Sequence, residues 1–460
     1  MRIALIRPDL GLQKKKKEIG KFCLEPKSLS ILASLTPADD EIRIADDRLE
    51  PMPYDEPFDL VALSVGTFQA RRAYEIADAF RARGRKVVMG GFHPTFCPEE
   101  AAEHADAVAM GEAEGLWPTI LEDARRGQLQ REYRKAERPE LTLPPCRPNV
   151  VPTNRYAPMS VVQFGRGCNH NCDFCCIKAY YKSSLRHRPA DEVIAEIRRG
   201  GRDWVFFADD NLIADRAQAK EFLRQLIPLG IRWVSQTSLD FVDDPELLEL
   251  MVKSGCQVVI IGLESLDPKN LRQMGKGWSK AVDYGQKLKI IRDNGIMVYG
   301  TFVFGYDGDT PDVFARTLDF ALEQKLFMAN FNHLQPYPGT RLYERLRKES
   351  RLVYEKWWLD PAYRFGQACF HPRQMSAEQL TQGAFETRCK FSSWSGIARR
   401  FLDFRANAGS FYNALTFLLT NLASQLDIHR KQGIPLGSAK PDSKAPDESM
   451  RDPDKARSAA

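Results

Sequence analysis

Several patterns are missing from this 460-residue chain, and each absence argues against a class of protein. No run of about 18 apolar residues appears, so the sequence predicts no membrane-spanning helix. A short apolar run at residues 1–12 precedes the lysines at 14–17, which reverses the order of a secretory signal. The net charge of +5 is near balance and gives no basis for a nucleic-acid partner. The ten cysteines show no paired spacing outside one loop, so we expect a cytoplasmic protein in a reducing compartment.

The chain does contain one concentrated cysteine motif. Residues 165–178 read GRGCNHNCDFCCIK, in which Cys168, Cys172 and Cys175 follow the spacing C-x3-C-x2-C. Three thiolates on one tight loop can hold three irons of a 4Fe-4S cluster and leave the fourth iron open to a non-protein ligand. An open iron indicates chemistry in addition to electron storage. We expect the adjacent Cys176 to be a buried small residue, because neighbouring cysteines rarely reach irons on the same face of a cluster.

A zinc knuckle and a structural disulfide are the other uses of such cysteines. Zinc needs a fourth ligand, and His170 lies awkwardly inside the loop. Zinc motifs more often contain two separated C-x2-C pairs. The spacing therefore favours the iron-sulfur cluster.

The motif lies between an apolar segment at 159–164 and a helical one at 190–199, and it resembles the signature of the radical S-adenosylmethionine (radical SAM) superfamily. Phe174 is the aromatic residue that this family usually carries before the third cysteine. The resemblance implies that the amino and carboxylate groups of SAM chelate the open iron, and that Phe174 lies at the SAM site.

Residues 1–140 predict a separate α/β domain. Expected strands at 2–7, 41–46, 60–65, 86–89 and 107–110 alternate with expected helices at 28–35, 71–83, 98–104 and 115–126. This alternation is typical of a doubly wound parallel sheet, whose ligand lies at the carboxyl ends of the strands. Small residues at these ends would let a flat, bulky ligand approach the backbone, although Gly-Gly after a strand is often only a turn.

The strand ends read S-V-G-T, G-G-F-H-P-T and G-E-A-E, and together they resemble the Rossmann-like cobalamin-binding domain of cobalamin-dependent radical SAM enzymes. The resemblance implies cobalamin contacts from Ser64, Gly66, Thr67, Gly90, Gly91, His93, Gly111 and Glu112. The D-x-H-x-x-G motif, which supplies a histidine to cobalt in other cobalamin proteins, is absent. We therefore expect no histidine on the lower face of cobalt, and His93 taken alone is better explained as a loop-capping residue.

A stretch rich in proline, arginine and polar residues at 131–158 indicates a linker, which we place at 141–158. Six strand-helix units then predict a partial (β/α)6 radical SAM barrel at 159–340. Its expected strands are 159–164, 204–208, 232–237, 257–262, 297–304 and 328–336, and its expected helices are 189–199, 216–229, 245–254, 278–294 and 311–324.

Barrels of this kind carry their functional groups at the carboxyl ends of the strands. By position, Asp209 and Asp210 match the family's second-strand motif near the SAM amino group, and Glu264 matches the fourth-strand residue near the ribose or carboxylate. Gly305 ends a segment that resembles the strand flanking adenine, and Gln236 is a further expected SAM contact. An aspartate at a strand end also often only caps the next helix. Arg166 and Lys178 flank the cluster loop and suit either its negative charge or surface salt bridges.

Residues 341–436 predict a mostly helical C-terminal extension, with a capping serine at Ser376 and a long helical stretch at 401–426. It resembles the extension of relatives that act on hopanoids and tetrapyrroles, and the alternative is a lid across the barrel mouth. An apolar helical surface here would suit a hydrophobic substrate or a peripheral membrane contact. Residues 437–460 predict a disordered tail.

The resemblance implies a radical SAM enzyme that uses a 4Fe-4S cluster to cleave SAM into methionine and a 5'-deoxyadenosyl radical. It further implies cobalamin-dependent C-methylation of a hydrophobic or polycyclic metabolite, with a flavodoxin- or ferredoxin-type reductant. Two alternatives stay open: a cyclase, oxidase or rearrangement enzyme with the same cofactors, and a non-catalytic iron-sulfur sensor or electron carrier. No side chain is singled out as a catalytic acid or base.

Overall fold

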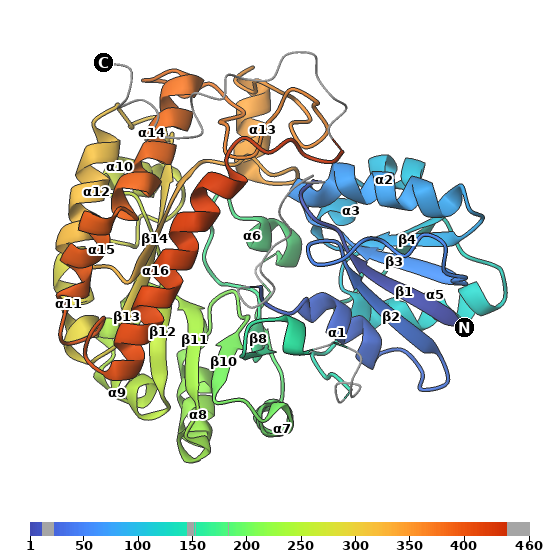
Figure 1. The fold of residues 1–460 in the computed structure, drawn as a ribbon, viewed down its shortest axis with the longest axis horizontal. Helices are drawn as coiled ribbons and strands as arrows, with labels where there is room; N and C mark the ends of the chain where they lie inside the picture. Colours follow the sequence, from blue (N-terminus) through green and yellow to red (C-terminus); the bar gives the residue numbers. More distant parts are fainter. Residues whose placement is uncertain (12–22, 145–150, 152, 183, 439–460) are drawn as a thin grey trace.

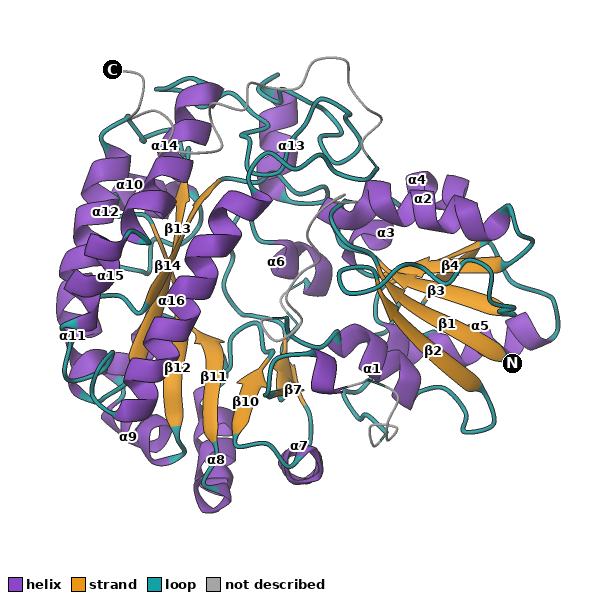
Figure 2. Ribbon diagram, in the orientation of Figure 1, coloured by secondary structure: helices purple, strands orange, loops and turns teal. Residues whose placement is uncertain are grey.

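The computed structural model describes residues 1–11, 23–144, 151, 153–182 and 184–438. Two parallel β-sheets with surrounding helices are followed by a helical C-terminal segment (Figures 1 and 2). Within the described ranges, no helix has the length and apolar character needed to cross a membrane. The lysines at 14–17, part of the expected linker at 145–150 and 152, and most of the expected tail at 439–460 lie outside the described residues.

The N-terminal unit is the doubly wound parallel sheet that the alternation predicts, with strand order β2-β1-β3-β4-β5-β6. Its strands are β1 (Arg2–Arg7), β2 (Glu41–Asp46), β3 (Leu60–Ser64), β4 (Lys86–Gly90), β5 (Ala107–Met110) and β6 (Glu132–Arg134). Its helices are α1 (Lys27–Ser34), α2 (Ala70–Arg81), α3 (Phe92–Phe96), α4 (Pro98–His104) and α5 (Trp117–Arg125). A separate buried core lies on each face of the sheet. The sequence did not predict β6, because only its middle residue, Tyr133, is buried and three residues show no period.

The second unit is the expected partial barrel, with six parallel strands in the order β14-β13-β12-β11-β10-β7. The strands are β7 (Ser160–Val162), β10 (Trp204–Phe207), β11 (Arg232–Thr237), β12 (Cys256–Glu264), β13 (Met297–Phe304) and β14 (Met328–His333). A short antiparallel pair, β8 (Gly165–Arg166) and β9 (Arg186–His187), flanks the cysteine loop. The helices are α6 (Cys176–Tyr181), α7 (Ala190–Gly200), α8 (Arg216–Leu226), α9 (Pro245–Lys253), α10 (Pro268–Gln273), α11 (Tyr284–Asp293) and α12 (Val313–Glu323).

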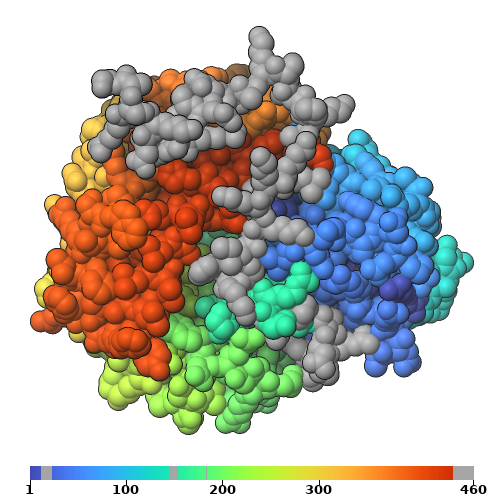
Figure 3. Space-filling model, in the orientation of Figure 1, coloured from blue at the N-terminus to red at the C-terminus, as the bar shows by residue number. Residues whose placement is uncertain are grey.

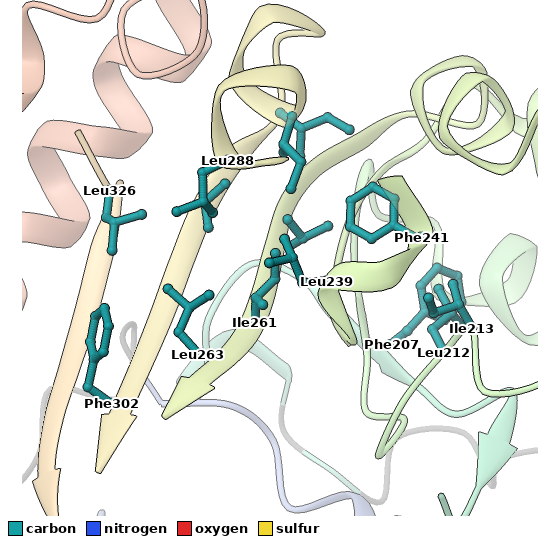
Figure 4. Packing of buried hydrophobic residues seen from close by; sticks show 14 of the residues in the cluster. Phe207, Leu212, Ile213, Leu239, Phe241, Ile261, Leu263, Leu288, Phe302 and Leu326 are labelled. Carbon is teal, nitrogen blue, oxygen red and sulfur yellow. The ribbon is translucent and has the colours of Figure 1, made fainter. Parts of the chain in front are cut away.

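The barrel core packs one face of these strands against the outer helices. Figure 4 shows Leu263, Leu288 and Phe302 within it, and all three side chains are fully buried. Burying a side chain of this size contributes about 1.5–3 kcal/mol. Successive residues of a strand face opposite sides, so Glu264, next to Leu263, points away from this core.

Two expected helices are shorter than their patterns suggest. The pattern at 278–294 predicts one helix, but α11 begins at Tyr284, directly after a 3-10 helix at Ala281–Asp283. Trp278 precedes both and stacks on His170. The stretch at 401–426 is divided between α15 (Trp394–Phe401) and α16 (Phe411–Lys431). Ser410 caps α16 through the Asn413 N–H, so the break follows from a local capping signal.

The C-terminal extension contains α13 (Arg341–Lys348), α14 (Ala377–Phe391), α15 and α16, and α14 begins with the expected cap at Ser376. In α16, Phe417 packs with Met297 and Met328, the first residues of β13 and β14. The first half of this helix therefore covers the amino ends of the strands there and does not form a lid across the carboxyl-end mouth. The orange and red extension forms much of the visible surface on the barrel side (Figure 3).

The extension also packs against the N-terminal unit. Trp357, Trp358 and Tyr363 are buried in the same core as α2, and the Trp358 indole N–H donates to Glu100 at 2.9 Å. Gly437 forms a bridge with Gly11, so the described start of the expected tail is paired with the N-terminus. The extension thereby fixes the two sheets relative to each other.

Candidate functional site

The three motif cysteines lie on the loop between β8 and α6. Cys168, Cys172 and Cys175 are partly exposed free thiols, and Cys176 begins α6 in a similarly half-buried position. Burial is the main cause that raises the pKa of the Cys172 thiol to about 12, and the thiols of Cys175 and Cys168 act in the same direction. Three crowded thiols that resist ionisation on their own suit a cationic iron centre, which stabilises thiolates.

Two carboxylates hold the start of this loop. After β10, Asp209 accepts hydrogen bonds from the backbone N–H groups of Phe164 and Gly165 at 2.9 and 2.6 Å. Asp210 accepts one from Gly167 at 2.8 Å. Burial raises the pKa of Asp209 to about 7, against the effect of the two N–H groups. The oxygens that we expected near the SAM amino group are thus directed at the backbone of the cysteine loop.

The other side of the loop rests on the segment after α10. The Asp173 N–H donates to the Met274 carbonyl at 2.9 Å, and the rings of His170 and Trp278 stack with centroids 4.0 Å apart. Gly275 is required here, because a Cβ atom would lie 2.4 Å from the Asn171 carbonyl oxygen. Across the part of the chain that the structure describes, no three His, Cys, Asp or Glu side chains are placed to hold a single metal ion.

Glu264 ends β12 in a strained conformation. Its φ of 63° is in the left-handed region, next to a register shift in the pairing with β13. Its carboxylate pairs with Lys276 at 3.0 Å, and Lys276 also donates to the Gly262 carbonyl at 2.6 Å. Burial would lower the pKa of Lys276, but the Glu264 carboxylate raises it above its usual value. Backbone strain of this kind, about 1–3 kcal/mol, persists where the surroundings impose it, often at functional sites.

The remaining expected SAM contacts are spread along the barrel. Gln236 is exposed on β11 between the buried Ser235 and Thr237, so it faces away from the barrel core. Phe174 packs partly buried against that core. The N–H of Gly305, just after β13, donates to Asp309 at 2.8 Å, and a Cβ atom there would lie 2.8 Å from side-chain atoms of the extension.

A cavity of about 310 Å³ opens at the carboxyl edge of the N-terminal sheet. Of the residues expected there, six belong to its lining: Ser64, Gly66, Gly90, Gly91, Gly111 and Glu112. Its depth is apolar, with Ala62, Val88 and Ala109 from the strands and Leu32 and Ile120 from the flanking helices. Gly111 has a φ of 104° and open space where a Cβ atom would stand, so the backbone is accessible to a ligand.

Arg166, Tyr180 and Tyr181 close the same cavity from the other unit. Two of these residues lie on α6, which Figure 1 shows between the two sheets. The lining is mostly apolar with a few polar groups at its edge, which is typical of cofactor sites.

Thr67 and His93 lie outside the lining of this cavity. The His93 side chain is fully buried, with Nε2 at 3.0 Å from the Tyr74 hydroxyl and 3.1 Å from Glu100. Its backbone N–H donates to the Val65 carbonyl at 3.1 Å. These contacts fit the structural, loop-capping interpretation of His93.

An ion cluster joins the two units beside the cavity. Glu112 accepts from Arg166 at 2.8 Å, from Arg186 at 2.7 Å and from Arg138 at 3.0 Å. Arg166 also pairs with Glu114 at 2.8 Å. Burial would raise the pKa of Glu112, but the arginines, chiefly Arg186 and Arg166, lower it below its usual value. The sequence suggested either that Arg166 balances the negative charge of the cluster or that it forms surface salt bridges. Its salt bridges are observed, but in a buried position.

Comparisons with known proteins agree with this arrangement. Residues 162–321 match the family model of the radical SAM superfamily, and residues 34–121 match that of the B12 binding domain. Bacteriochlorophyllide d C-12(1)-methyltransferase of Chlorobaculum tepidum is 30% identical over 403 residues, which cover 85% of this chain and 87% of that protein. The chain belongs to the cobalamin-dependent radical SAM methyltransferase family.

A second relative from the same organism, bacteriochlorophyllide d C-8(2)-methyltransferase, is 31% identical over 353 residues, covering 72% of this chain and 78% of that protein. Among solved structures, the radical SAM methyltransferase TsrM from Kitasatospora setae with cobalamin and [4Fe-4S] cluster bound gives a TM-score of 0.63. The identity is 15%, with 94% of this chain and 98% of that chain covered, so this likeness shows a shared fold.

Membership in this family gives the enzyme a 4Fe-4S cluster, SAM and cobalamin as cofactors. The residues present fit them. The free thiols of the cysteine loop suit iron, and the apolar cavity with an accessible backbone at Gly111 suits a flat corrinoid.

The sequence interpretation missed two groups of residues at the site. Lys276 was not singled out, although a lysine between two glycines in the loop after α10 is an available signal. The cavity residues Tyr180 and Tyr181 follow directly on the cysteine motif, where their short distance from Cys176 could have indicated them.

Proposed function

We propose that this enzyme transfers a methyl group from SAM to a carbon atom of a hydrophobic, polycyclic small molecule, and that cobalamin carries the methyl group. One observation carries the proposal: the wall of the apolar cavity includes Tyr180 and Tyr181, on the same short helix that begins beside Cys175. Because α6 rises about 1.5 Å per residue, Cys175 and these two tyrosines are only about 7.5–9 Å apart along the helix axis.

The roles of individual residues are part of this proposal. Cys168, Cys172 and Cys175 would hold the cluster, and the six expected residues of the cavity lining would contact cobalamin. Glu264, fixed by Lys276, and the exposed Gln236 would contact SAM. For Asp209 and Asp210, whose oxygens accept loop N–H groups, we propose a positioning role in place of SAM contact.

When bound, the cluster and cobalamin supply one-electron cleavage of SAM and methyl-group carriage, which no side chain can provide. The chain's own residues bind and orient the cofactors and shield them from water. Asp209 and Asp210 fix the backbone before Cys168, and the buried pair of Glu264 and Lys276 holds one end of β12 rigid. The ion cluster around Glu112 closes the edge of the cavity and limits access of water.

The substrate class is supported by the two relatives whose names give bacteriochlorophyllide as their substrate. Their similarity extends over most of each chain, so a polycyclic, largely apolar substrate is the best starting hypothesis. The eight described cysteines from Cys97 to Cys389 are free thiols, which supports a reducing, cytoplasmic location.

We also propose a peripheral membrane contact through α16. Its outward face exposes apolar side chains that include Phe411 (77%), Leu419 (52%) and Leu426 (70%), while Asn413 and Asn421 are buried. An apolar face of this kind suits the headgroup boundary of a bilayer. Co-sedimentation with anionic lipid vesicles should be lost in a Leu419→Glu variant, and equal co-sedimentation of both proteins would contradict the contact.

The methyl transfer itself is tested with anaerobically reconstituted protein, SAM labelled in its methyl group, a reductant, cobalamin and a chlorin substrate. We expect label in the chlorin, together with S-adenosylhomocysteine and 5'-deoxyadenosine. Deoxyadenosine with an altered but unlabelled chlorin would favour the cyclase or rearrangement alternative. A reduced cluster that yields neither SAM-derived product would favour an electron carrier or sensor.

A further inference from the structure

A second cavity lies against the cysteine loop, next to α6 and the start of α13. Its volume is about 330 Å³, and Cys172 and Cys175 belong to its lining. Lys178, Lys182 and Arg341 line it as well. Two of the three expected cluster ligands are therefore reached from the protein surface through this opening.

The charge around this opening is positive. Lys182 and Arg341 are exposed, and Arg341 also donates a hydrogen bond to the Asn171 carbonyl at 2.5 Å. The carboxylate in the lining, Asp173, is engaged inside the protein. Asp173 accepts a hydrogen bond from the Tyr306 hydroxyl at 2.7 Å and lies 3.6 Å from Arg345. Lys182 directly follows α6 and has a left-handed backbone conformation with a φ of 50°. Glycine or asparagine is usual at such a helix end.

The basic character continues into a third cavity of about 380 Å³, which shares Ala179 and Lys182 with the second. Arg134 and Lys135 are exposed in its lining. Of its two carboxylates, Glu112 is paired with arginines, and Glu137 is exposed. A continuous surface thus surrounds the outer end of α6, and we call Arg134, Lys135, Lys182 and Arg341 the basic rim.

The geometry points to the basic rim as the docking surface of an acidic one-electron carrier protein. This rests on the proposed function, because a cluster held by these cysteines must receive an electron from outside before each SAM cleavage. In the docking step one electron moves from the reduced carrier to the oxidised cluster. The carrier is oxidised, the cluster is reduced, and no bond or proton changes place.

Charge complementarity selects a protein with an acidic face. Exposed charges steer an oppositely charged partner and raise its association rate by about 10–10³-fold at low salt. The rim side chains surround the opening to Cys172 and Cys175, so a partner attracted by them is held where the cover over these cysteines is thin.

The test compares two reductants of opposite charge on the reconstituted full-length enzyme without substrate. Reduction of the cluster is followed by stopped-flow absorbance with photoreduced flavodoxin, an acidic protein, and with the methyl viologen radical cation. In a Lys135→Glu/Lys182→Glu variant we expect at least tenfold slower reduction by flavodoxin, in line with the loss of steering. Reduction by viologen should stay equal or become faster.

The matched control is Arg224→Glu/Lys253→Glu, which changes the net charge equally on exposed positions of α8 and α9. It should leave both reactions near wild type. Equal slowing of flavodoxin by both variants would show an effect of net charge alone, and slower viologen reduction would show damage to the cluster. Either result, or unchanged flavodoxin kinetics in the rim variant, would overturn the assignment.

A binding measurement supports the kinetics without the cluster. Flavodoxin should bind wild-type apoprotein more tightly than the rim variant, and the difference should vanish near 1 M salt, where the screening length is about 3 Å. Equal binding at low salt would contradict the proposal. Because no methyl acceptor is present, failure here is distinguishable from failure of the proposed methyl transfer.

Discussion

Arg166 connects the cysteine loop to the proposed cobalamin cavity, and its removal is expected to weaken cobalamin binding. Its side chain is 6% exposed, and its guanidinium pairs with Glu112 and Glu114, both at 2.8 Å. These carboxylates outweigh the effect of burial and raise the pKa of Arg166 above its usual value. Removing one partner of a buried ion pair costs about 3–5 kcal/mol. We expect the lower end for Arg166→Ala, because Glu112 keeps Arg186 and Arg138 while Glu114 loses the arginine.

Part of this cost lowers the free energy of unfolding, and part lowers the free energy of cobalamin binding because the cavity is no longer closed. If about half is expressed in binding, cobalamin affinity falls by about tenfold, since 1.4 kcal/mol corresponds to one factor of ten. Spectrophotometric titration of the purified protein with cobalamin measures this affinity, and iron content is determined in parallel. Arg166→Lys, which keeps the charge but not the planar two-sided geometry, should fall between wild type and alanine.

Arg126→Ala is the matched control, because Arg126 belongs to the N-terminal unit and pairs with Glu122, but its side chain is 62% exposed and lies outside the cavity lining. Its effect on affinity should be small, since exposed pairs contribute about 1 kcal/mol or less. The reasoning would be refuted if Arg166→Ala bound cobalamin within twofold of wild type, or if Arg126→Ala lost as much affinity.

Three further predictions concern single residues. Cys172→Ala should lose cluster absorbance and iron after reconstitution, whereas Cys176→Ala should keep both; retained iron in the first variant would contradict the ligand assignment. Gly111→Val should lose cobalamin binding with unchanged iron content. Its φ of 104° disfavours any side chain, and the valine side chain would also fill part of the cavity. Cobalamin binding equal to wild type would show that the cavity is not the corrinoid site. Burial raises the pKa of Asp309 from 3.8 to about 6, so its stabilising contribution is full below about pH 4 and is lost as the pH rises through 6. Chemical denaturation should therefore show Asp309→Asn gaining up to about 3 kcal/mol relative to wild type between pH 4 and 7, and a pH-independent difference would argue against the shift.

The sequence predicts the sheets well because buried parallel strands leave a strong signal. Apolar runs such as residues 60–63 end in small or polar residues, and the structure places Ser64, Gly66, Gly90 and Gly111 around one cavity as a consequence. The cysteine spacing is equally informative, since three thiols on one loop need no information from distant parts of the chain.

Contacts that depend on tertiary structure could not be predicted. Arg166 and Glu112 are 54 positions apart, and ion pairs between separate elements leave no periodic pattern. The pattern at 278–294 is helical from its first residue, but Trp278 lies before the first helical turn at Ala281–Asp283 and stacks on the distant His170. His93 shows why a resemblance alone cannot place a side chain: the resemblance implied a cobalamin contact, whereas the ring is buried in a polar network with Tyr74 and Glu100, as the loop-capping interpretation expects.

The placement of α6 accounts for how the two proposed cofactor sites become neighbours. The helix begins immediately after Cys175 and ends at Tyr181, so about one turn and a half connects this proposed iron ligand with the cavity wall. The same loop is held from the barrel side by Asp209 and Asp210, and from the N-terminal side through Arg166. Both anchors act on one continuous segment, so the distance between Cys175 and the part of the cavity wall formed by Tyr180 and Tyr181 is set by local helix geometry. The rest of the lining belongs to the N-terminal unit, and the ion cluster and the C-terminal extension hold that unit against α6.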